Sequence, residues 1–167
     1  MRALALWLAL PFALVVLAFR GWREPQRRMD LGARLGLALA PAARAPLWLH
    51  GASVGEVQAA AGLIRLLRVR HPSLPLLLTC GSATGLARAR LLYGDLLLPG
   101  ESGGSPLALR PAPFDLPGAV RRFLEACAPR GLVLLETELW PNLIAGAGER
   151  GVPLAMLSAR VSERSTQ

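Results

Sequence analysis

Lysine is missing from this 167-residue chain, and all 19 of its basic residues are arginine. With only 11 acidic residues, the formal net charge is +8. A compositional bias toward arginine accounts for this charge, and so would attraction to an anionic phospholipid surface, a phosphorylated substrate or nucleic acid. Aromatic residues are also scarce, with one Tyr and four Phe, and the arginines are not grouped with them. The composition therefore argues against a nucleic-acid-binding protein.

Cysteine is equally sparse, with Cys80 and Cys127 as its two occurrences. They form no CxxC pair and no cluster with histidine, so the sequence contains no recognisable zinc site. Two cysteines in a chain long enough for one domain are typical of buried, reduced thiols in the cytoplasm. A disulfide between them is the alternative.

Apolar residues make up 53% of the chain, and residues 3–19 are an unbroken run of them. Such a run is at the short limit for a helix that spans a bilayer. A cleaved signal peptide fits poorly, because no small-x-small site closes the run and a strongly basic flank begins at Arg20. The positive-inside rule places that flank in the cytoplasm. We therefore predict a membrane anchor over residues 1–22, although Pro11 would kink a spanning helix and leaves a position in one leaflet open.

Residues 23–45 are predicted to form a basic linker, which either favours an anionic leaflet or is simply solvated chain. The predicted folded domain, residues 46–167, alternates apolar runs with amphipathic stretches. The pattern predicts strands at 47–50, 74–79, 110–114, 131–136 and 152–157, and helices at 56–70, 86–93, 115–128 and 141–151. Asp115 is expected to be an N-cap. Residues 94–109, rich in Gly, Pro and Ser, are expected to form an irregular surface excursion.

Alternation of strands and helices with short loops predicts an α/β domain with a parallel sheet and right-handed crossovers. In such sheets the ligand binds beyond the carboxyl ends of the strands. The loops at that edge decide which residues matter. They are expected at residues 53–56, 81–85, 114–115, 136–140 and 158–160.

Glu56 closes the sequence GASVGE (residues 51–56), where the first loop meets the first predicted helix. Ser53 and Gly55 are small enough to let a substrate approach the backbone. The free N–H groups at a helix start favour a negative group. A glutamate in a first helical turn is equally well explained as a partner of the helix dipole, so on these residues alone both interpretations stay open.

Two further carboxylates, Glu136 and Glu138, directly follow a wholly apolar predicted strand in the sequence ETELWPN (residues 136–142). Charged groups at the end of a buried strand are costly unless they serve a site. The alternative is that they cap the helix predicted to begin at Pro141. Arg160, after the last predicted strand, could pair with them or hold a phosphate.

These motifs together resemble the N-terminal domain of the 3-deoxy-D-manno-octulosonic acid (Kdo) transferases of lipopolysaccharide assembly. The resemblance covers nearly the whole chain in register, and the combination of SVGE with ETELWPN is highly specific. The matching segments are WLHGASVGEVQAA (48–60), HPSLPLLLT (71–79), ATG (83–85), FDLPGAVRRFL (114–124), ETELWPNLI (136–144) and SARVSERS (158–165).

The resemblance implies a GT-B glycosyltransferase with two Rossmann-like halves, of which residues 46–167 would be the acceptor-binding half. It implies CMP-Kdo as donor, a lipid A precursor (lipid IVA) as acceptor, inversion of configuration, and neither a metal nor another cofactor. Glu56 would be the general base and Glu136 a second catalytic carboxylate. The substrate-binding positions would be Ser53, Gly55, Thr84, Gly85, Glu138 and Arg160. The enzyme would lie at the cytoplasmic face of the inner membrane, held by the N-terminal anchor.

The chain departs from the family pattern after the second predicted strand, where Cys80 and Gly81 replace hydroxyl-bearing residues and Leu86 replaces a serine. The family also continues beyond the position of Gln167, so we expect the donor-binding domain to lie outside this sequence. A membrane-tethered module that binds lipid A precursors without catalysis is the alternative function. Another GT-B transferase with a different sugar fits the ETELWPN motif less well.

Overall fold

The structure, a computed structural model, describes residues 31–37, 45–97, 105–135 and 139–157. Within these residues the strands form one parallel five-stranded sheet, in the order β3-β2-β1-β4-β5. The strands are β1 (Leu47–Gly51), β2 (Leu76–Cys80), β3 (Leu107–Pro111), β4 (Gly131–Leu134) and β5 (Leu154–Met156). This order is that of a doubly wound Rossmann-like sheet, which confirms the predicted α/β fold class.

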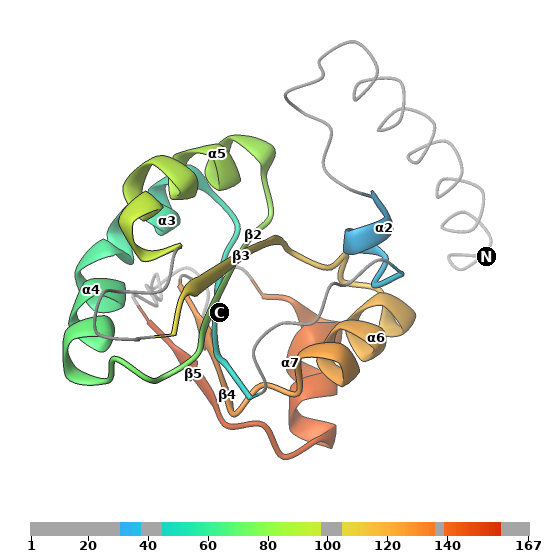
Figure 1. The fold of residues 1–167 in the computed structure, drawn as a ribbon. Helices are drawn as coiled ribbons and strands as arrows, with labels where there is room; N and C mark the ends of the chain where they lie inside the picture. Colours follow the sequence, from blue (N-terminus) through green and yellow to red (C-terminus); the bar gives the residue numbers. More distant parts are fainter. Residues whose placement is uncertain (1–30, 38–44, 98–104, 136–138, 158–167) are drawn as a thin grey trace, which may run out of the picture.

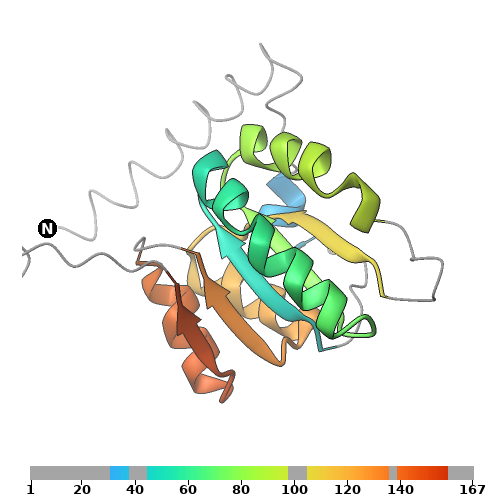
Figure 2. The ribbon, with the colours of Figure 1, turned by 90° about the vertical axis from the view of Figure 1, so that its left-hand side faces the viewer.

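Helices cover both faces of the sheet (Figures 1 and 2). One face carries α3 (Val54–Ala59), α4 (Ala61–Arg70) and α5 (Ala83–Leu92), followed by the short η2 (Gly94–Leu96). The other face carries α6 (Pro117–Cys127) and α7 (Pro141–Glu149). The strand order reverses at β1, so right-handed crossovers from β1 and from β4 place their helices on opposite faces.

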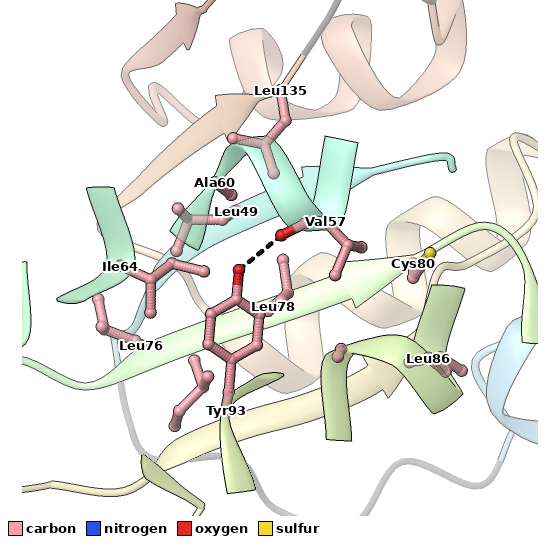
Figure 3. Packing of buried hydrophobic residues seen from close by; sticks show 12 residues of the cluster. Leu49, Val57, Ala60, Ile64, Leu76, Leu78, Cys80, Leu86, Tyr93 and Leu135 are labelled. Atoms are coloured by element: carbon pink, nitrogen blue, oxygen red, sulfur yellow. Dashed lines mark hydrogen bonds between the residues drawn. The ribbon is translucent and has the colours of Figure 1, made fainter. Parts of the chain in front are cut away.

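The core beneath α3, α4 and α5 is built around Tyr93, whose side chain is fully buried (Figure 3). Its hydroxyl donates a hydrogen bond to the carbonyl oxygen of Val57, 2.5 Å away. Aliphatic side chains from β1, β2 and the three helices complete this cluster. They include Leu49, Ile64, Leu76, Leu78 and Leu86.

The second core cluster lies on the other face of the sheet. Phe123 of α6 packs against Trp48 of β1, with ring centroids 4.7 Å apart. Gly146 of α7 allows close packing, because a Cβ there would lie 3.1 Å from side-chain atoms of Leu124 and Val120. The buried residues of α6 recur at helical spacing, which explains why this segment folds as an amphipathic helix. They are Ala119, Val120, Phe123, Leu124 and Cys127.

The two cysteines are both buried and free, and they belong to different clusters. Burial raises the pKa of Cys127 to about 11, so this thiol stays protonated at neutral pH. The prediction of buried, reduced thiols is confirmed, and the alternative disulfide is not formed.

Part of the predicted linker is folded against the domain. Helix α2 (Leu31–Arg34) lies beside β3 and α6, and Arg122 donates hydrogen bonds to the carbonyl oxygen of Leu35. Gly36 has a φ of +71°, and a Cβ there would lie 2.9 Å from Cβ of Arg122. The predicted anchor, residues 1–22, lies outside the described residues. Among the helices that the structure describes, none has the length and apolar character needed to cross a bilayer.

The single helix predicted over 56–70 is wrong, because the structure has two helices that meet at Ala60. The backbone of Ala60 has a ψ of −9°, outside the helical range that continues a regular turn. Just before this break, the carbonyl oxygen of Val57 accepts a hydrogen bond from the hydroxyl group of Tyr93. A partner at the C-cap of α5, distant in sequence, therefore accompanies the interruption.

The strand predicted over 110–114 is displaced. β3 spans Leu107–Pro111, so the irregular excursion predicted over 94–109 wrongly includes residues 107–109, the first part of this strand. Leu107 pairs with Leu76 and Pro111 with Cys80 in parallel register. The many Gly, Pro and Ser residues before residue 107 obscured the short apolar run that pairs with β2.

Asp115 does not cap its own helix, contrary to the prediction. The N-cap of α6 is Leu116, which makes no side-chain capping bond. The Asp115 carboxylate instead accepts hydrogen bonds from the backbone N–H of Leu143 (2.8 Å) and of Asn142 (3.2 Å). It therefore caps α7, because α6 and α7 lie side by side.

Candidate functional site

The site is centred on the carboxyl end of β1, where the strand order of the sheet reverses. Strands β2 and β4 flank β1. In open α/β sheets ligands bind in the crevice at such a switch point. The two sequence motifs follow the two strands at this point, since GASVGE ends β1 and opens α3, and ETELWPN follows β4.

Glu56 folds back onto the loop that precedes it. Ser53 is the N-cap of α3, and its Oγ accepts a hydrogen bond from the backbone N–H of Glu56 (3.3 Å). The Ser53 hydroxyl donates to Oε1 of Glu56 (2.8 Å), and the N–H of Ala52 donates to Oε2 (2.6 Å). This is a variant of the capping box: Ser53 Oγ accepts the N–H of the third helical residue as in the standard motif, but the Glu56 carboxylate accepts the N–H of Ala52 in place of that of Ser53. Glu56 is 5% exposed, and these bonds hold its carboxylate in one orientation.

The capping bonds leave the carboxylate able to act on a substrate. A carboxylate oxygen has two lone pairs, and each oxygen of Glu56 uses one of them on the loop. The remaining lone pairs can accept a hydroxyl proton. The arrangement thus fulfils both interpretations of the motif, because Glu56 is a helix-cap partner and also a fixed acceptor at the ligand edge of the sheet.

Two glycines make this geometry possible. A Cβ at Gly51 would lie 3.3 Å from Cβ of Glu56 and 3.5 Å from its Oε2. A Cβ at Gly81 would lie 3.1 Å from the carbonyl oxygen of Ala52, and the Gly81 N–H donates to the carbonyl oxygen of Gly51 (3.0 Å). The loops after β1 and β2 therefore pack directly on each other, and the hydroxyl-free Gly81 serves this packing.

The predicted binding residues around these loops have different environments. Ser53 and Gly55 are exposed, and Thr84 is exposed in the first turn of α5. Gly85 is buried, and a Cβ there would lie 2.2 Å from Sγ of Cys80. This contact accounts for glycine at position 85, whereas the three exposed residues are accessible to a ligand. Their binding roles stay predictions.

The predicted residues Glu136, Glu138 and Arg160 lie outside the described residues, and their roles stay predictions. The structure nevertheless bears on one alternative for the two glutamates. The N–H groups of Asn142 and Leu143 at the start of α7 are already bound by Asp115. Capping of that helix is therefore provided without Glu136 or Glu138.

A buried histidine at the end of β1 is a part of the site that the sequence interpretation missed. His50 is 2% exposed, and its Nδ1 lies 2.8 Å from Oγ1 of Thr79, to which Trp48 Nε1 also donates (2.8 Å). The ring of Trp140 stands edge-on to the imidazole, with centroids 4.6 Å apart. Burial, with a smaller contribution from Arg34, lowers the pKa of His50 to about 4. A polar residue ending an apolar strand was the available signal.

Arg34 reaches the same edge of the sheet from α2. Its Nε donates to the carbonyl oxygen of Ala112 (3.0 Å), and its guanidinium lies 4.0 Å from the centroid of the Phe114 ring. Burial lowers the pKa of Arg34, although a guanidinium remains charged at neutral pH. A fixed positive charge thus lies near the carboxyl end of the strands. In the part of the chain that the structure describes, no group of three or more His, Cys, Asp or Glu could hold a metal ion.

The chain is similar in sequence to known transferases. Residues 29–167 match the family model for 3-deoxy-D-manno-octulosonic-acid transferase (kdotransferase). The chain is 45% identical over 141 residues to the 3-deoxy-D-manno-octulosonic acid transferase of Bordetella pertussis; the aligned region covers 84% of this chain and 30% of that protein. It is 32% identical over 157 residues to the Haemophilus influenzae transferase of the same name, covering 93% of this chain and 34% of the relative.

A plant relative extends the comparison beyond bacteria. The probable mitochondrial 3-deoxy-D-manno-octulosonic acid transferase of Arabidopsis thaliana is 35% identical over 121 residues, covering 71% of this chain and 24% of that protein. The chain thus spans between 24% and 34% of the length of these three curated relatives. The matched region, residues 29–167, includes both motifs and every candidate site residue. On these matches, the chain belongs to the 3-deoxy-D-manno-octulosonic acid (Kdo) transferase family.

Proposed function

We propose that the protein containing this chain transfers Kdo from CMP-Kdo to a lipid A precursor, lipid IVA, in lipopolysaccharide biosynthesis. The observation that supports this most directly is the buried Glu56 carboxylate, held by Ala52 and Ser53 at the switch point of a Kdo transferase family domain. Residues 46–167 would provide the acceptor-binding half.

In the proposed reaction Glu56 accepts the proton of an acceptor hydroxyl as that oxygen attacks the anomeric carbon of Kdo. The new glycosidic bond forms, the bond from the anomeric carbon to the phosphate oxygen breaks, and CMP leaves with the bonding electrons. Attack opposite the leaving group inverts the configuration. General-base assistance of this kind contributes about 10²- to 10⁴-fold to rate.

The other predicted residues have supporting roles in this proposal. Glu136 is a second catalytic carboxylate, while Glu138 and Arg160 bind substrate. Ser53, Gly55 and Thr84 are exposed around Glu56 and can contact the acceptor. Gly85 supports the same surface from within α5. We further propose attachment to the cytoplasmic face of the inner membrane through residues 1–22, where the lipid acceptor would be available.

One observation favours the alternative of a non-catalytic binding module. The capping box by itself explains a glutamate at position 56, since both carboxylate oxygens have partners in the loop. In that case the domain would hold the lipid A precursor and Glu56 would only stabilise α3. The two functions differ in whether Glu56 exchanges a proton with the acceptor.

The substitution Glu56→Gln separates these functions. Glutamine can keep the cap, because its Oε1 can accept the Ala52 N–H while its amide group donates to Ser53 Oγ. It cannot serve as a base. In the full-length protein we expect Glu56→Gln to fold normally, to retain lipid IVA binding, and to lose at least about 10²-fold in Kdo transfer.

Transfer is measured with CMP-Kdo and lipid IVA in detergent, and the glycolipid product is quantified by mass spectrometry. Asp115→Ala is the control, because it removes a helix cap elsewhere in the domain and leaves the Glu56 loop unchanged. A Glu56→Gln variant with near-normal turnover would remove the proposed base. A wild-type protein that binds lipid IVA and transfers no Kdo would support the binding module instead.

A further inference from the structure

His50 connects four elements at the switch point of the sheet. It lies one residue before Gly51, at the start of the loop that carries Glu56. Its side chain contacts Thr79 at the end of β2 and Trp140 at the start of α7. Its carbonyl oxygen accepts a hydrogen bond from the N–H of Leu135, directly after β4 (2.9 Å).

The hydrogen bonds around Thr79 indicate how the imidazole is protonated. The Thr79 hydroxyl accepts from Nε1 of Trp48, and its own hydrogen can be donated to Nδ1 of His50. This assignment from the network satisfies the hydroxyl and places the ring proton on Nε2. Nε2 is buried and, among the residues that the structure describes, has no hydrogen-bond partner.

The imidazole is also a poor candidate for proton transfer. Its burial and the nearby Arg34 hold the pKa of His50 at about 4, so the ring is neutral at neutral pH. What the ring does provide is a rigid link between strand ends that are far apart in sequence.

We propose that His50 is a positioning residue of the transferase reaction, which fixes the Glu56 loop relative to β2 and α7 through Thr79 and Trp140. The proposal rests on the proposed role of Glu56 as base. Glu56 must reach a substrate hydroxyl within hydrogen-bond distance, and displacements of about 1 Å can cost roughly 10²-fold in rate. A link from the base of the loop to two neighbouring elements restricts such displacements.

Each of two substitutions keeps one contact of the imidazole and removes the other. His50→Asn keeps an amide group near the position of Nδ1, toward Thr79, and removes the ring that contacts Trp140. His50→Phe keeps a ring beside Trp140 and removes the bond to Thr79. In the full-length protein we expect each variant to lower kcat by about 10- to 100-fold, with KM for CMP-Kdo and lipid IVA changed less than about threefold.

Trp48→Phe is the matched control. Trp48 lies on the same strand face as His50 and donates to the same Thr79 hydroxyl, and it is farther from the Glu56 loop in sequence. We expect this variant to lose thermal stability while its kcat stays within about threefold of wild type. Equal kcat losses in Trp48→Phe and the His50 variants would overturn the proposal, because the effect would then be one of general stability.

Amide hydrogen exchange tests the positioning without relying on catalysis. The N–H groups of Ala52, Glu56 and Val57 are hydrogen-bonded within the loop and the first turn of α3. We expect their exchange to accelerate by about tenfold or more in both His50 variants and not in Trp48→Phe. Unchanged exchange in the His50 variants overturns the proposal, even if the wild-type protein proves inactive. Wild-type kcat in those variants, with an inactive Glu56→Gln, overturns it while leaving the function of Glu56 intact.

Discussion

The capping box around Glu56 predicts a coupled loss of stability when either partner is removed. Glu56→Ala deletes the acceptor of two hydrogen bonds, one from the Ala52 N–H (2.6 Å) and one from the Ser53 hydroxyl (2.8 Å). Ser53→Ala deletes the second of these bonds and also the bond from the Glu56 N–H (3.3 Å). The two substitutions therefore share one interaction.

The magnitudes follow from the exposure of the groups. Hydrogen bonds to a charged group contribute about 1.5–3 kcal/mol each, and water can replace the lost partner of an exposed hydroxyl. Ser53 is exposed and Glu56 is 5% exposed, so we expect Glu56→Ala to cost roughly 2–4 kcal/mol. Loss of a serine N-cap costs about 1 kcal/mol. Because the pair shares a bond, the double variant should cost about 1 kcal/mol less than the sum.

Urea unfolding followed by circular dichroism measures these differences for the wild type, both single variants and the double variant. Glu56→Gln is the internal control, since glutamine can keep the cap, and it should cost less than about 1 kcal/mol. Strict additivity of the two alanine substitutions, or a cost below about 0.5 kcal/mol for Glu56→Ala, would show that the capping box does not hold the loop.

Three further predictions concern the surroundings of the site. Asp115→Ala should lower the free energy of unfolding by about 1–2 kcal/mol, since it removes the cap of α7, with exchange of the Leu143 amide as the local readout; an unchanged amide would contradict the interhelical cap. Gly85→Ala should cost about 1–3 kcal/mol through contacts with Cys80 Sγ and Ser82 Oγ, and Cys80→Ala in the same protein should relieve the part that is due to Sγ, as measured by chemical denaturation. Burial lowers the pKa of His50 from 6.5 to about 4, so between these pH values the unfolded chain binds more protons than the folded protein. The free energy of unfolding should therefore fall by about 3 kcal/mol as the pH falls from 6.5 toward 4, and His50→Asn should flatten this part of the stability–pH curve.

The fold class could be predicted from sequence because each strand is a short apolar run bounded by turn residues. Such runs over residues 47–50 and 131–136 correspond to the buried strands β1 and β4. The errors arose where tertiary contacts decide the local structure. The Tyr93 hydroxyl donates a hydrogen bond to the carbonyl oxygen of Val57, beside the break after α3. Strand β2 pairs with residues 107–109, which lie inside a segment rich in Gly, Pro and Ser.

The candidate site could be predicted in part. Glu56 stood out because a carboxylate follows small residues at the end of an apolar strand. His50 did not, because its significance depends on Thr79 and Trp140, which are 29 and 90 positions away in the sequence. Asp115 was assigned to the wrong helix for the same reason, since its partners Asn142 and Leu143 become neighbours only when α6 and α7 pack together.

By itself, the sequence of this protein determined the period of its strands and helices, the family to which it belongs, and the loop that holds its carboxylate. These properties depend on residues close together in the chain, where propensity and capping act. Only the tertiary structure decided that His50 links that loop to β2 and α7. Those contacts exist because a parallel sheet brings the carboxyl ends of distant strands to one edge.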